Sequence, residues 1–341
     1  MKKSTINDVA REAGVSKSTV SQYLNERYAY MSEETRKRIA EVIDRLNYRP
    51  NGAARSLKQK RTRTVGIVVA DIRYTLSIEC IRAIESELVR RGNQVMICNA
   101  DENPDLEGRA IEDLIARKVD GLILFPTGHR HAMYKQLVDE DVPFVFLDRL
   151  VDGVTAHSLL LDNERAARLA VDEFVGRGHT RIGLLSLALG PRAITPRKER
   201  VSGFRRAMEE AGLAVNEACL ASVPVDRIGE ELERMLALPE PPTALLAAND
   251  LVLAEVLKAA NRRGIAIPDE LSIIGIDEAA FASIYNPVIT TLRQPASEMG
   301  TQAAKTILAR IEGKDVGVPI TYRFHPELIR GSSVKGLPSP H

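Results

Sequence analysis

From Thr64 onward, short apolar runs alternate with longer amphipathic segments along most of the chain. The runs are apolar throughout and too short for buried helices, which is typical of parallel strands that are covered on both faces. Nine such runs occur: TVGIVVA, NQVMICNA, DGLILFP, PFVFLD, HSLLLD, RIGLLS, CLASVPV, TALLAAN and LSIIGID. The segments between them predict helices that pack on the sheets, so the fold class is α/β. Nine strands are too many for one mononucleotide-type half and suit two lobes.

The break between these two lobes is expected in DRLVDGVTAHS, where the pattern is interrupted. Further on, VITTLRQPASEMG predicts a strand or connector followed by a helix, and ITYRFHPELI predicts one final alternating strand. We therefore expect a core over residues 64–337. Its lobes are expected at about 64–155 plus 293–320, and about 156–290 plus 321–335. Several crossovers would then join the lobes, with a cleft between them.

Residues 5–48 follow a different pattern, with three hydroxyl residues placed as helix N-caps. Thr5 pairs with Asp8 as in a capping box, Ser16 precedes KSTVSQYLN, and Ser32 precedes an acidic first turn. Between the first two helices, AGVS puts Gly14 where a left-handed backbone is most easily accommodated. Three short helices around one small core, with a tight turn between the first two, predict a helix-turn-helix domain over residues 1–48.

The charge of the chain is unevenly distributed. The first 64 residues carry 15 basic and 7 acidic side chains, a net charge of +8, whereas the remainder carries 32 and 39, a net charge of −7. This asymmetry favours a basic head that binds a polyanion. The three cysteines are few, widely spaced and odd in number, which indicates reduced core thiols. With neither an apolar leader nor a membrane-spanning run, we expect a cytoplasmic protein.

TINDVAREAGVSKSTVSQYLN, followed by SEETRKRIAEVIDRLNYRPNGAARSLK, closely resembles the headpiece and hinge of the lactose and galactose repressor family of bacterial transcription regulators. The body is similar too, through VDGLIL, the R-x-x-G-F of Arg200 to Phe204, AANDLVLAEVLKAANRRG, IPDELSIIGIDE and TTLRQP. The resemblance implies a core like that of periplasmic binding proteins, palindromic operator DNA as partner, and a small-molecule effector. It also implies a homodimer, because the tail RGSSVKGLPSPH lacks the leucine heptads of tetrameric members.

The second helix of the headpiece is the expected reader of DNA bases. The base-reading positions of the family fall on Lys17, Ser18 and Gln22, whose side chains can donate to or pair with base edges in the major groove. Four further residues are expected to contact phosphates, which fix the register without reading sequence: Thr5, Thr19, Ser21 and Asn25. Polar residues on a short helix are more often merely solvated. The charge asymmetry and the turn favour the functional interpretation here.

Residues 49–63 are expected to form a hinge helix and linker. Their basic composition alone is more typical of a solvated linker. The resemblance implies a short helix around Ala53 to Leu57 that forms on operator DNA, with Leu57 inserted as an apolar wedge between base pairs in the minor groove. Ala53 is small enough for close approach of two such helices, and Arg55 and Lys58 add positive charge.

Polar residues at successive strand ends predict a ligand site in the cleft, because the carboxyl ends of parallel strands converge on one edge. The expected effector-binding residues are Tyr74, Ser77, Asp148, Arg149, Arg197, Arg200, Asn249 and Asp277. Arg200, Asn249 and Asp277 match ligand-binding positions of the family. The stretch from Arg73 to Ser77 departs from the family's N-P-F-F pattern, so that any aromatic platform for a sugar ring would have to come from Tyr74 or Phe281.

The chemistry of the effector stays open between two classes. The basic segment from Arg192 to Arg200, with Arg149, predicts an anion such as a sugar acid or keto acid, because arginine presents a fork matched to carboxylate. A neutral sugar beside a solvated basic loop is the alternative. We expect a transcriptional regulator that represses genes of carbohydrate or sugar-acid metabolism.

Two other functions have less support in the sequence. A solute-binding protein without a DNA role would share the two lobes but would not need the basic head. An enzyme is disfavoured because the chain has no Walker loop, nucleophile elbow or CxxC motif. His129 and His131 have no third ligand at a spacing typical of zinc sites, so neither a metal nor a cofactor is expected.

Overall fold

The headpiece is built from three short helices, α1 (Ile6–Ala13), α2 (Lys17–Leu24) and α3 (Glu33–Arg45). The expected N-caps are confirmed. The Thr5 side chain forms a capping box with Asp8, and the side chains of Ser16 and Ser32 accept hydrogen bonds from backbone amides of the first turns of α2 and α3. Gly14 ends α1 with a φ of +63°, the left-handed conformation expected for this turn. The three helices share one core: Val9, Ala10, Ala13, Val20, Ile39 and Val42.

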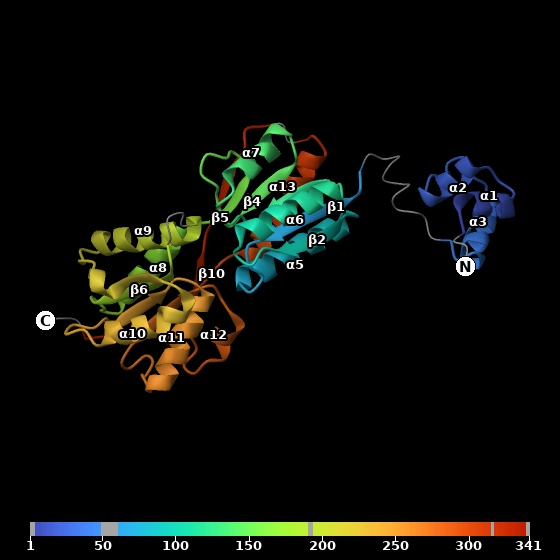
Figure 1. Cartoon of the computed structure of the whole chain (residues 1–341). Coiled ribbons are helices and arrows are strands. Elements are labelled where there is room, and N and C mark those ends of the chain that lie inside the picture. The colour runs from blue at the N-terminus through green and yellow to red at the C-terminus, as the bar shows by residue number, and fades with distance from the viewer. Residues whose placement is uncertain (1–3, 49–60, 190–193, 315–316, 339–341) are drawn as a thin grey trace. The chain divides into compact units, whose positions relative to one another are not determined.

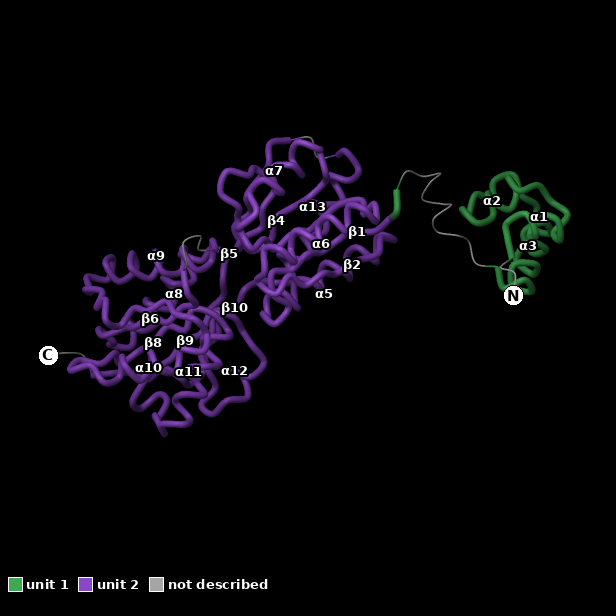
Figure 2. The backbone as a smooth tube through the Cα atoms, viewed as in Figure 1, with its two compact units in different colours: residues 1–62 green, residues 63–341 purple. Residues whose placement is uncertain are grey.

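The computed structural model describes residues 4–48, 61–189, 194–314 and 317–338. It divides into two compact units, residues 1–62 and 63–341 (Figure 2). The second unit contains two sheets, each with six strands (Figure 1). The first sheet has the order β11-β5-β4-β3-β1-β2 and the second β12-β10-β9-β8-β6-β7. All pairs are parallel except β10 with β12, as the continuous apolar runs predict.

The strands of the first sheet are β1 (Thr64–Val69), β2 (Gln94–Asn99), β3 (Gly121–Leu124), β4 (Phe144–Leu147), β5 (Ser158–Leu161) and β11 (Thr321–Phe324). Helices α5 (Thr75–Arg90) and α13 (Ala296–Ile311) bury their apolar residues against one face of this sheet. Helices α6 (Pro104–Ala116) and α7 (His131–Asp139) bury theirs against the other face. The first lobe is therefore a sheet between two layers of helices.

The second lobe repeats this arrangement. Its strands are β6 (Ile182–Leu187), β7 (Leu220–Val223), β8 (Ala244–Ala247), β9 (Ser272–Ile276), β10 (Thr290–Arg293) and β12 (Glu327–Ile329). One face packs on α8 (Asn163–Gly176) and α9 (Thr195–Glu210), and the other on α10 (Ile228–Leu236), α11 (Asp250–Arg263) and α12 (Ala280–Ile284). Two short 3-10 helices, Glu217–Cys219 and Val225–Arg227, complete the lobe.

The boundaries between the lobes differ from the expectation at two strands. Residues from 156 onward were expected in the second lobe, but β5 pairs with β4, with Phe146 opposite Ser158. The final strand was expected to be continuous, but it is broken at Pro326, which has no backbone N–H to donate to a ladder. Its first half, β11, pairs with β5 and its second half, β12, with β10. The chain consequently crosses between lobes after β5, β10 and β11.

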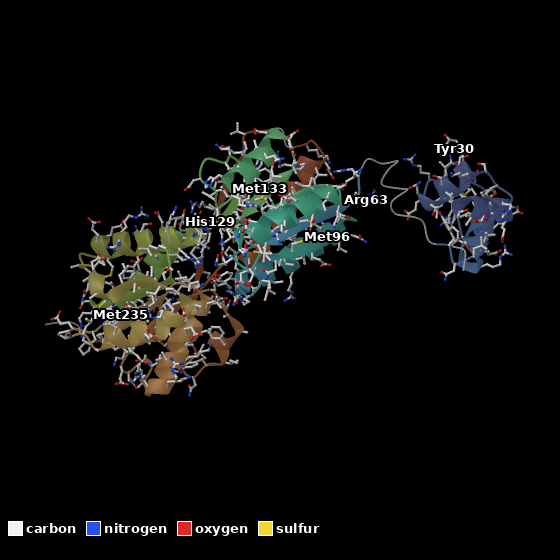
Figure 3. The ribbon with its side chains drawn as sticks, viewed as in Figure 1. Tyr30, Arg63, Met96, His129, Met133 and Met235 are labelled. Carbon is white, nitrogen blue, oxygen red and sulfur yellow. The ribbon has the colours of Figure 1, made fainter. Side chains whose placement is uncertain are left out.

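Side chains cover both lobes and the headpiece (Figure 3). On the headpiece Tyr30 projects outward, with 99% of its surface exposed. Among the helices that the structure describes, not one has the length and apolar character needed to span a bilayer.

Candidate nucleic-acid interface and ligand pocket

Helix α2 is anchored by one buried side chain and presents its polar residues outward. Val20 is fully buried in the headpiece core, whereas Lys17, Ser18 and Gln22 are exposed. Ser18 and Gln22 are four residues apart and therefore share one face of the helix. The predicted base-reading residues are thus accessible on a helix that is anchored in the headpiece core, which is the geometry that major-groove reading requires.

The predicted phosphate contacts are partly engaged within the headpiece. The Thr5 hydroxyl donates to Asp8 Oδ2 at 2.7 Å, and the Thr19 and Ser16 hydroxyls share a hydrogen bond at 2.9 Å. Asn25 ends α2, and its Nδ2 donates to the Ser21 carbonyl at 2.6 Å. These side chains stabilise the helix ends, and their DNA role stays a prediction. The predicted hinge residues lie outside the described residues: Ala53, Arg55, Leu57 and Lys58.

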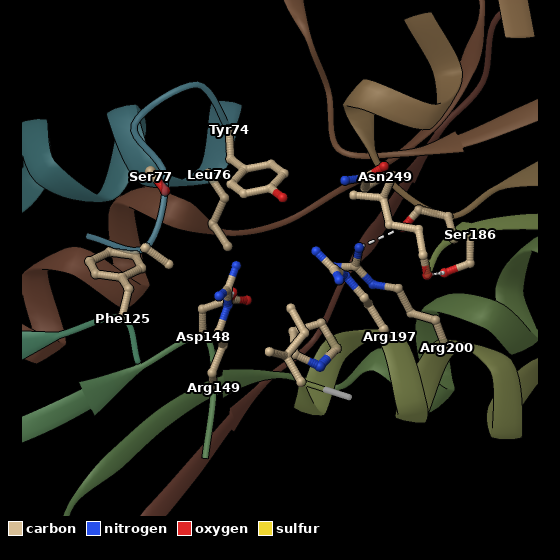
Figure 4. Close-up of a pocket in the computed structure, with 15 residues that line it drawn as sticks. Tyr74, Leu76, Ser77, Phe125, Asp148, Arg149, Ser186, Arg197, Arg200 and Asn249 are labelled. Atoms are coloured by element: carbon tan, nitrogen blue, oxygen red, sulfur yellow. Dashed lines mark hydrogen bonds and ion pairs between the residues drawn. The ribbon is translucent and has the colours of Figure 1, made fainter. Parts of the chain in front are cut away.

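A pocket with a volume of about 530 Å³, its open mouth included, lies between the two lobes of the core (Figure 4). It is formed by the ends of β1, β3 and β4 and the start of α5 on one side, and by β6, β8 and the start of α9 on the other. Seven of the eight predicted effector residues line it: Tyr74, Ser77, Asp148, Arg149, Arg197, Arg200 and Asn249. The alternation of strands and helices brings them together because each follows the carboxyl end of a parallel strand or begins the next helix.

Asp277, the eighth predicted residue, is not part of the lining. Its carboxylate is buried and accepts hydrogen bonds from the Gln294 side chain and, at 3.4 Å, from the Asp250 backbone amide. Burial, with smaller effects of Asp250 and Asp148, raises the pKa of Asp277 to about 6, although the charge of Arg200 opposes the shift. Phe281 is not in the lining either; the aromatic side chains that line the pocket are Tyr74 and Phe125.

Asp148 and Asp277 occupy equivalent positions in the two lobes. Each follows directly after a central strand, β4 or β9, and each backbone amide donates to the next strand, at 2.8 Å to Leu159 and 3.0 Å to Leu292. Both residues have left-handed backbones, with φ values of +69° and +82°. This conformation is unfavourable for residues other than glycine and is often retained at functional sites.

Arg149 is buried and already neutralised by the protein. Its guanidinium donates to both carboxylate oxygens of Glu102, at 2.7 and 3.1 Å, and its Nε donates to Asp148 at 3.3 Å. Burial alone would raise the pKa of Glu102, but the charge and hydrogen bonds of Arg149 outweigh it and hold this pKa below its ordinary value. The sequence analysis missed Glu102. This residue closely follows the apolar run of β2, and polar residues at strand ends are the signal that predicted the other residues of the pocket.

The two α9 arginines that line the pocket, Arg197 and Arg200, have a different environment. Arg200 is 95% buried and donates to the Asn163 side chain at 2.9 Å and to the Ala248 carbonyl at 2.5 Å. Arg197 is half-buried and donates to the Ala188 carbonyl at 3.0 Å. Both guanidinium groups therefore donate to neutral oxygens.

Asn249 lines the pocket and also stabilises the start of α11. Its side chain caps α11 by accepting from the Val252 amide at 2.9 Å. Tyr74 lies beside Glu102 and Arg197, and burial, reinforced by Glu102, raises its pKa to about 12, so this phenol is neutral near pH 7.

His129 and His131 line a surface groove between α6 and α7 rather than the interlobe pocket. Within the described ranges, no cluster of three or more histidine, cysteine, aspartate or glutamate side chains has the geometry to bind a metal ion. All three cysteines are free thiols.

The architecture defines a class, that of helix-turn-helix proteins with a periplasmic-binding-protein-like core. Residues 5–51 match the family of bacterial regulatory proteins called the lacI family, and residues 171–334 match a periplasmic binding protein-like domain. The chain is 43% identical to the probable HTH-type transcriptional regulator EndR of Paenibacillus polymyxa, over 91% of this chain and 92% of that one. It is also 32% identical to the HTH-type transcriptional regulator KdgR of Bacillus subtilis, over 97% of both chains.

Among solved structures, the lac repressor dimer bound to operator and the anti-inducer ONPF is similar, with a TM-score of 0.85 and 25% identity over 98% of this chain and all of that one. The chain therefore belongs to the LacI family of bacterial transcriptional regulators. It is a DNA-binding regulator and not an enzyme.

Proposed function

We propose that this protein is a dimeric repressor of genes for carbohydrate or sugar-acid metabolism, whose affinity for a palindromic operator is set by a small metabolite bound between the core lobes. One observation carries the proposal. A chain with an accessible recognition helix also has a pocket lined by buried charged residues from both lobes. Burying charged side chains costs free energy. Their concentration around one pocket therefore favours a specific polar ligand at this position.

In the proposed complex, Lys17, Ser18 and Gln22 face bases in the major groove, while Thr5, Thr19, Ser21 and Asn25 contact phosphates. The hinge residues Ala53, Arg55, Leu57 and Lys58 would enter the minor groove beside those of the partner subunit. The operator-bound lac repressor dimer supports two headpieces on one palindrome. DNA binding also implies that the protein acts in the cytoplasm.

The effector would bind to the predicted residues that line the pocket: Tyr74, Ser77, Asp148, Arg149, Arg197, Arg200 and Asn249. Asp277 would act indirectly, through its hydrogen bonds to Gln294 and the Asp250 amide. A ligand that contacts both lobes favours one lobe arrangement over another, and the headpiece is joined to the first lobe through residues 49–63. Typical coupling between two such sites is about 1–3 kcal/mol, equivalent to about a 5- to 150-fold change in operator affinity.

The test begins with the purified full-length protein and fragmented bacterial DNA. Retained fragments would be sequenced and footprinted, and candidate metabolites would then be tested for their effect on retention. We expect one palindromic motif to be enriched and at least one metabolite to change retention. The double substitution Lys17→Ala and Gln22→Ala should abolish the enrichment, whereas Lys258→Ala, an exposed cation on α11 of the core, should not.

The outcome separates this proposal from a solute-binding protein without a DNA role. Such a protein would bind a metabolite but would enrich no palindrome, and the double substitution would have no effect on DNA retention.

A further inference from the structure

The carboxylates around the interlobe pocket all accept hydrogen bonds from N–H donors of the protein. Glu102 and Asp148 are held by Arg149, and Asp277 by Gln294. Asp250, at the start of α11, accepts from the Thr75 amide at 2.8 Å. These acids are therefore internally satisfied, which reduces their availability to a ligand.

Arg197 and Arg200, the α9 arginines that line the pocket, lack such a match. Among the described residues, neither Arg197 nor Arg200 has a carboxylate oxygen within hydrogen-bonding distance. The nearest acid to Arg197 is Glu102, at 4.0 Å, and Glu102 already accepts both prongs of the Arg149 fork. An arginine has five N–H donors, and Arg197 and Arg200 each use only one or two of them, on neutral oxygens. The lining thus has spare cationic donors but no spare anion.

The start of α9 adds positive potential at the same place. This helix spans 16 residues, its N-cap Ile194 has no side-chain hydrogen bond to the first turn, and its first turn holds no acidic residue. Ile194, Pro196 and Arg197 all line the pocket, so the helix begins at the pocket wall. Pro196 has no backbone N–H, but the other amides at the helix start, together with the helix dipole, favour a bound anion.

We propose that the effector carries a carboxylate, which Arg197 binds at the start of α9, while Arg200 and Asn249 bind hydroxyl groups. This inference rests on the proposed function, since it names the ligand of the same pocket. It also favours a monoanion over a sugar phosphate, because Asp148, which lines the same pocket, would repel a second negative charge. Arg197, and not the internally paired Arg149, is then the residue that selects the effector class.

The test is isothermal titration of the full-length protein with matched pairs of compounds. Each aldonate, uronate or keto acid of sugar size, such as gluconate or galacturonate, is compared with its neutral sugar and with the sugar phosphate, such as glucose 6-phosphate. The variants are Arg197→Gln, Arg197→Lys and the control Arg205→Gln, which removes a partly exposed α9 arginine paired with Glu217. Thermal unfolding and operator binding of each variant check that it is folded.

We expect at least one acid to bind more tightly than its neutral partner. The substitution R197Q should weaken acid binding by about tenfold or more, the effect typical of a lost charge-assisted hydrogen bond, and should change neutral-sugar binding by less than about twofold. R197K should retain part of the acid preference and R205Q all of it. The proposal is overturned if neutral sugars or sugar phosphates bind best, if none of the acids binds, or if R197Q weakens both classes equally. Each of these results leaves operator binding intact, whereas failure of the proposed function would remove operator binding itself.

Discussion

The carboxylate of Asp250 accepts a hydrogen bond from the backbone amide of Thr75 at 2.8 Å, across the boundary between the two lobes. Thr75 begins α5 of the first lobe, and its N-cap Tyr74 supplies no side-chain cap, so the cap comes from α11 of the second lobe. Across the same boundary, the Leu150 amide donates to Thr195 Oγ1 at 2.9 Å. The lobes are therefore tied together beside the pocket by polar contacts that a shift in their arrangement would break.

Replacing Asp250 with alanine should loosen this connection. The Thr75 amide would lose a charged acceptor, and we expect the free energy of unfolding to fall by about 1.5–3 kcal/mol. We also expect the lobes to separate more easily without ligand. Urea unfolding measures the first effect and small-angle X-ray scattering the second, with Glu240→Ala, an exposed loop acid, as control. Unchanged scattering and stability would show that the contact does not hold the lobes.

Gly203→Ala should destabilise the second lobe through overpacking. A Cβ on Gly203 would lie 2.6 Å from the Glu164 Cα, so α8 and α9 would have to move apart, at a cost of about 1–3 kcal/mol. On the partner helix, a Cβ on Gly176 would meet nothing within 4 Å. Gly176→Ala is therefore the matched control and should leave stability unchanged or increase it. Equal melting temperatures for the two variants would contradict the close approach.

The stability of the core should depend on pH through Asp277. Burial raises its pKa from 3.8 to about 6, so the folded chain holds a proton there that the unfolded chain releases between these values. The stabilising contribution of this group is thus complete below pH 3.8 and is lost as the pH rises through about 6.

Asp277→Asn removes this titration. Its stability relative to the unmodified protein should therefore increase as the pH rises from 4 to 7. The measurement is urea unfolding across that range, with the exposed Asp226→Asn as control. A stability difference that does not change with pH would mean that Asp277 is ionised throughout.

Gln22→Ala should relax sequence specificity at one base pair of each operator half-site. A good side-chain pair to a base contributes about 1–3 kcal/mol of discrimination, so affinity for the preferred sequence should fall by about 5- to 150-fold. Affinity for sites already altered at that base should hardly change. Binding to a set of single-base operator variants measures this pattern, with Lys258→Ala as control. A uniform loss over all variants would instead indicate a phosphate contact.

Local signals in the sequence determine the headpiece helices, the strands of the core and most of the pocket lining. Thr5, Ser16 and Ser32 begin the three headpiece helices because a cap acts only on the turn that follows it. Continuous apolar runs gave parallel strands, since only strands buried on both faces need them. Polar residues near the carboxyl ends of strands also predicted seven lining residues of the pocket, because the carboxyl ends of parallel strands lie at one edge of the sheet.

Tertiary structure alone decides which strands pair and which charged side chains contact each other. Whether β5 completes the first or the second sheet depends on which strand lies beside it, and its four buried residues would suit either sheet. The pairing of Arg149 with Glu102 joins side chains 47 positions apart. The cap of Asp250 on α5 joins residues 175 positions apart. A residue's own pattern reveals its burial and local conformation, but charge pairing requires the distance between two groups, and only the folded chain sets that distance.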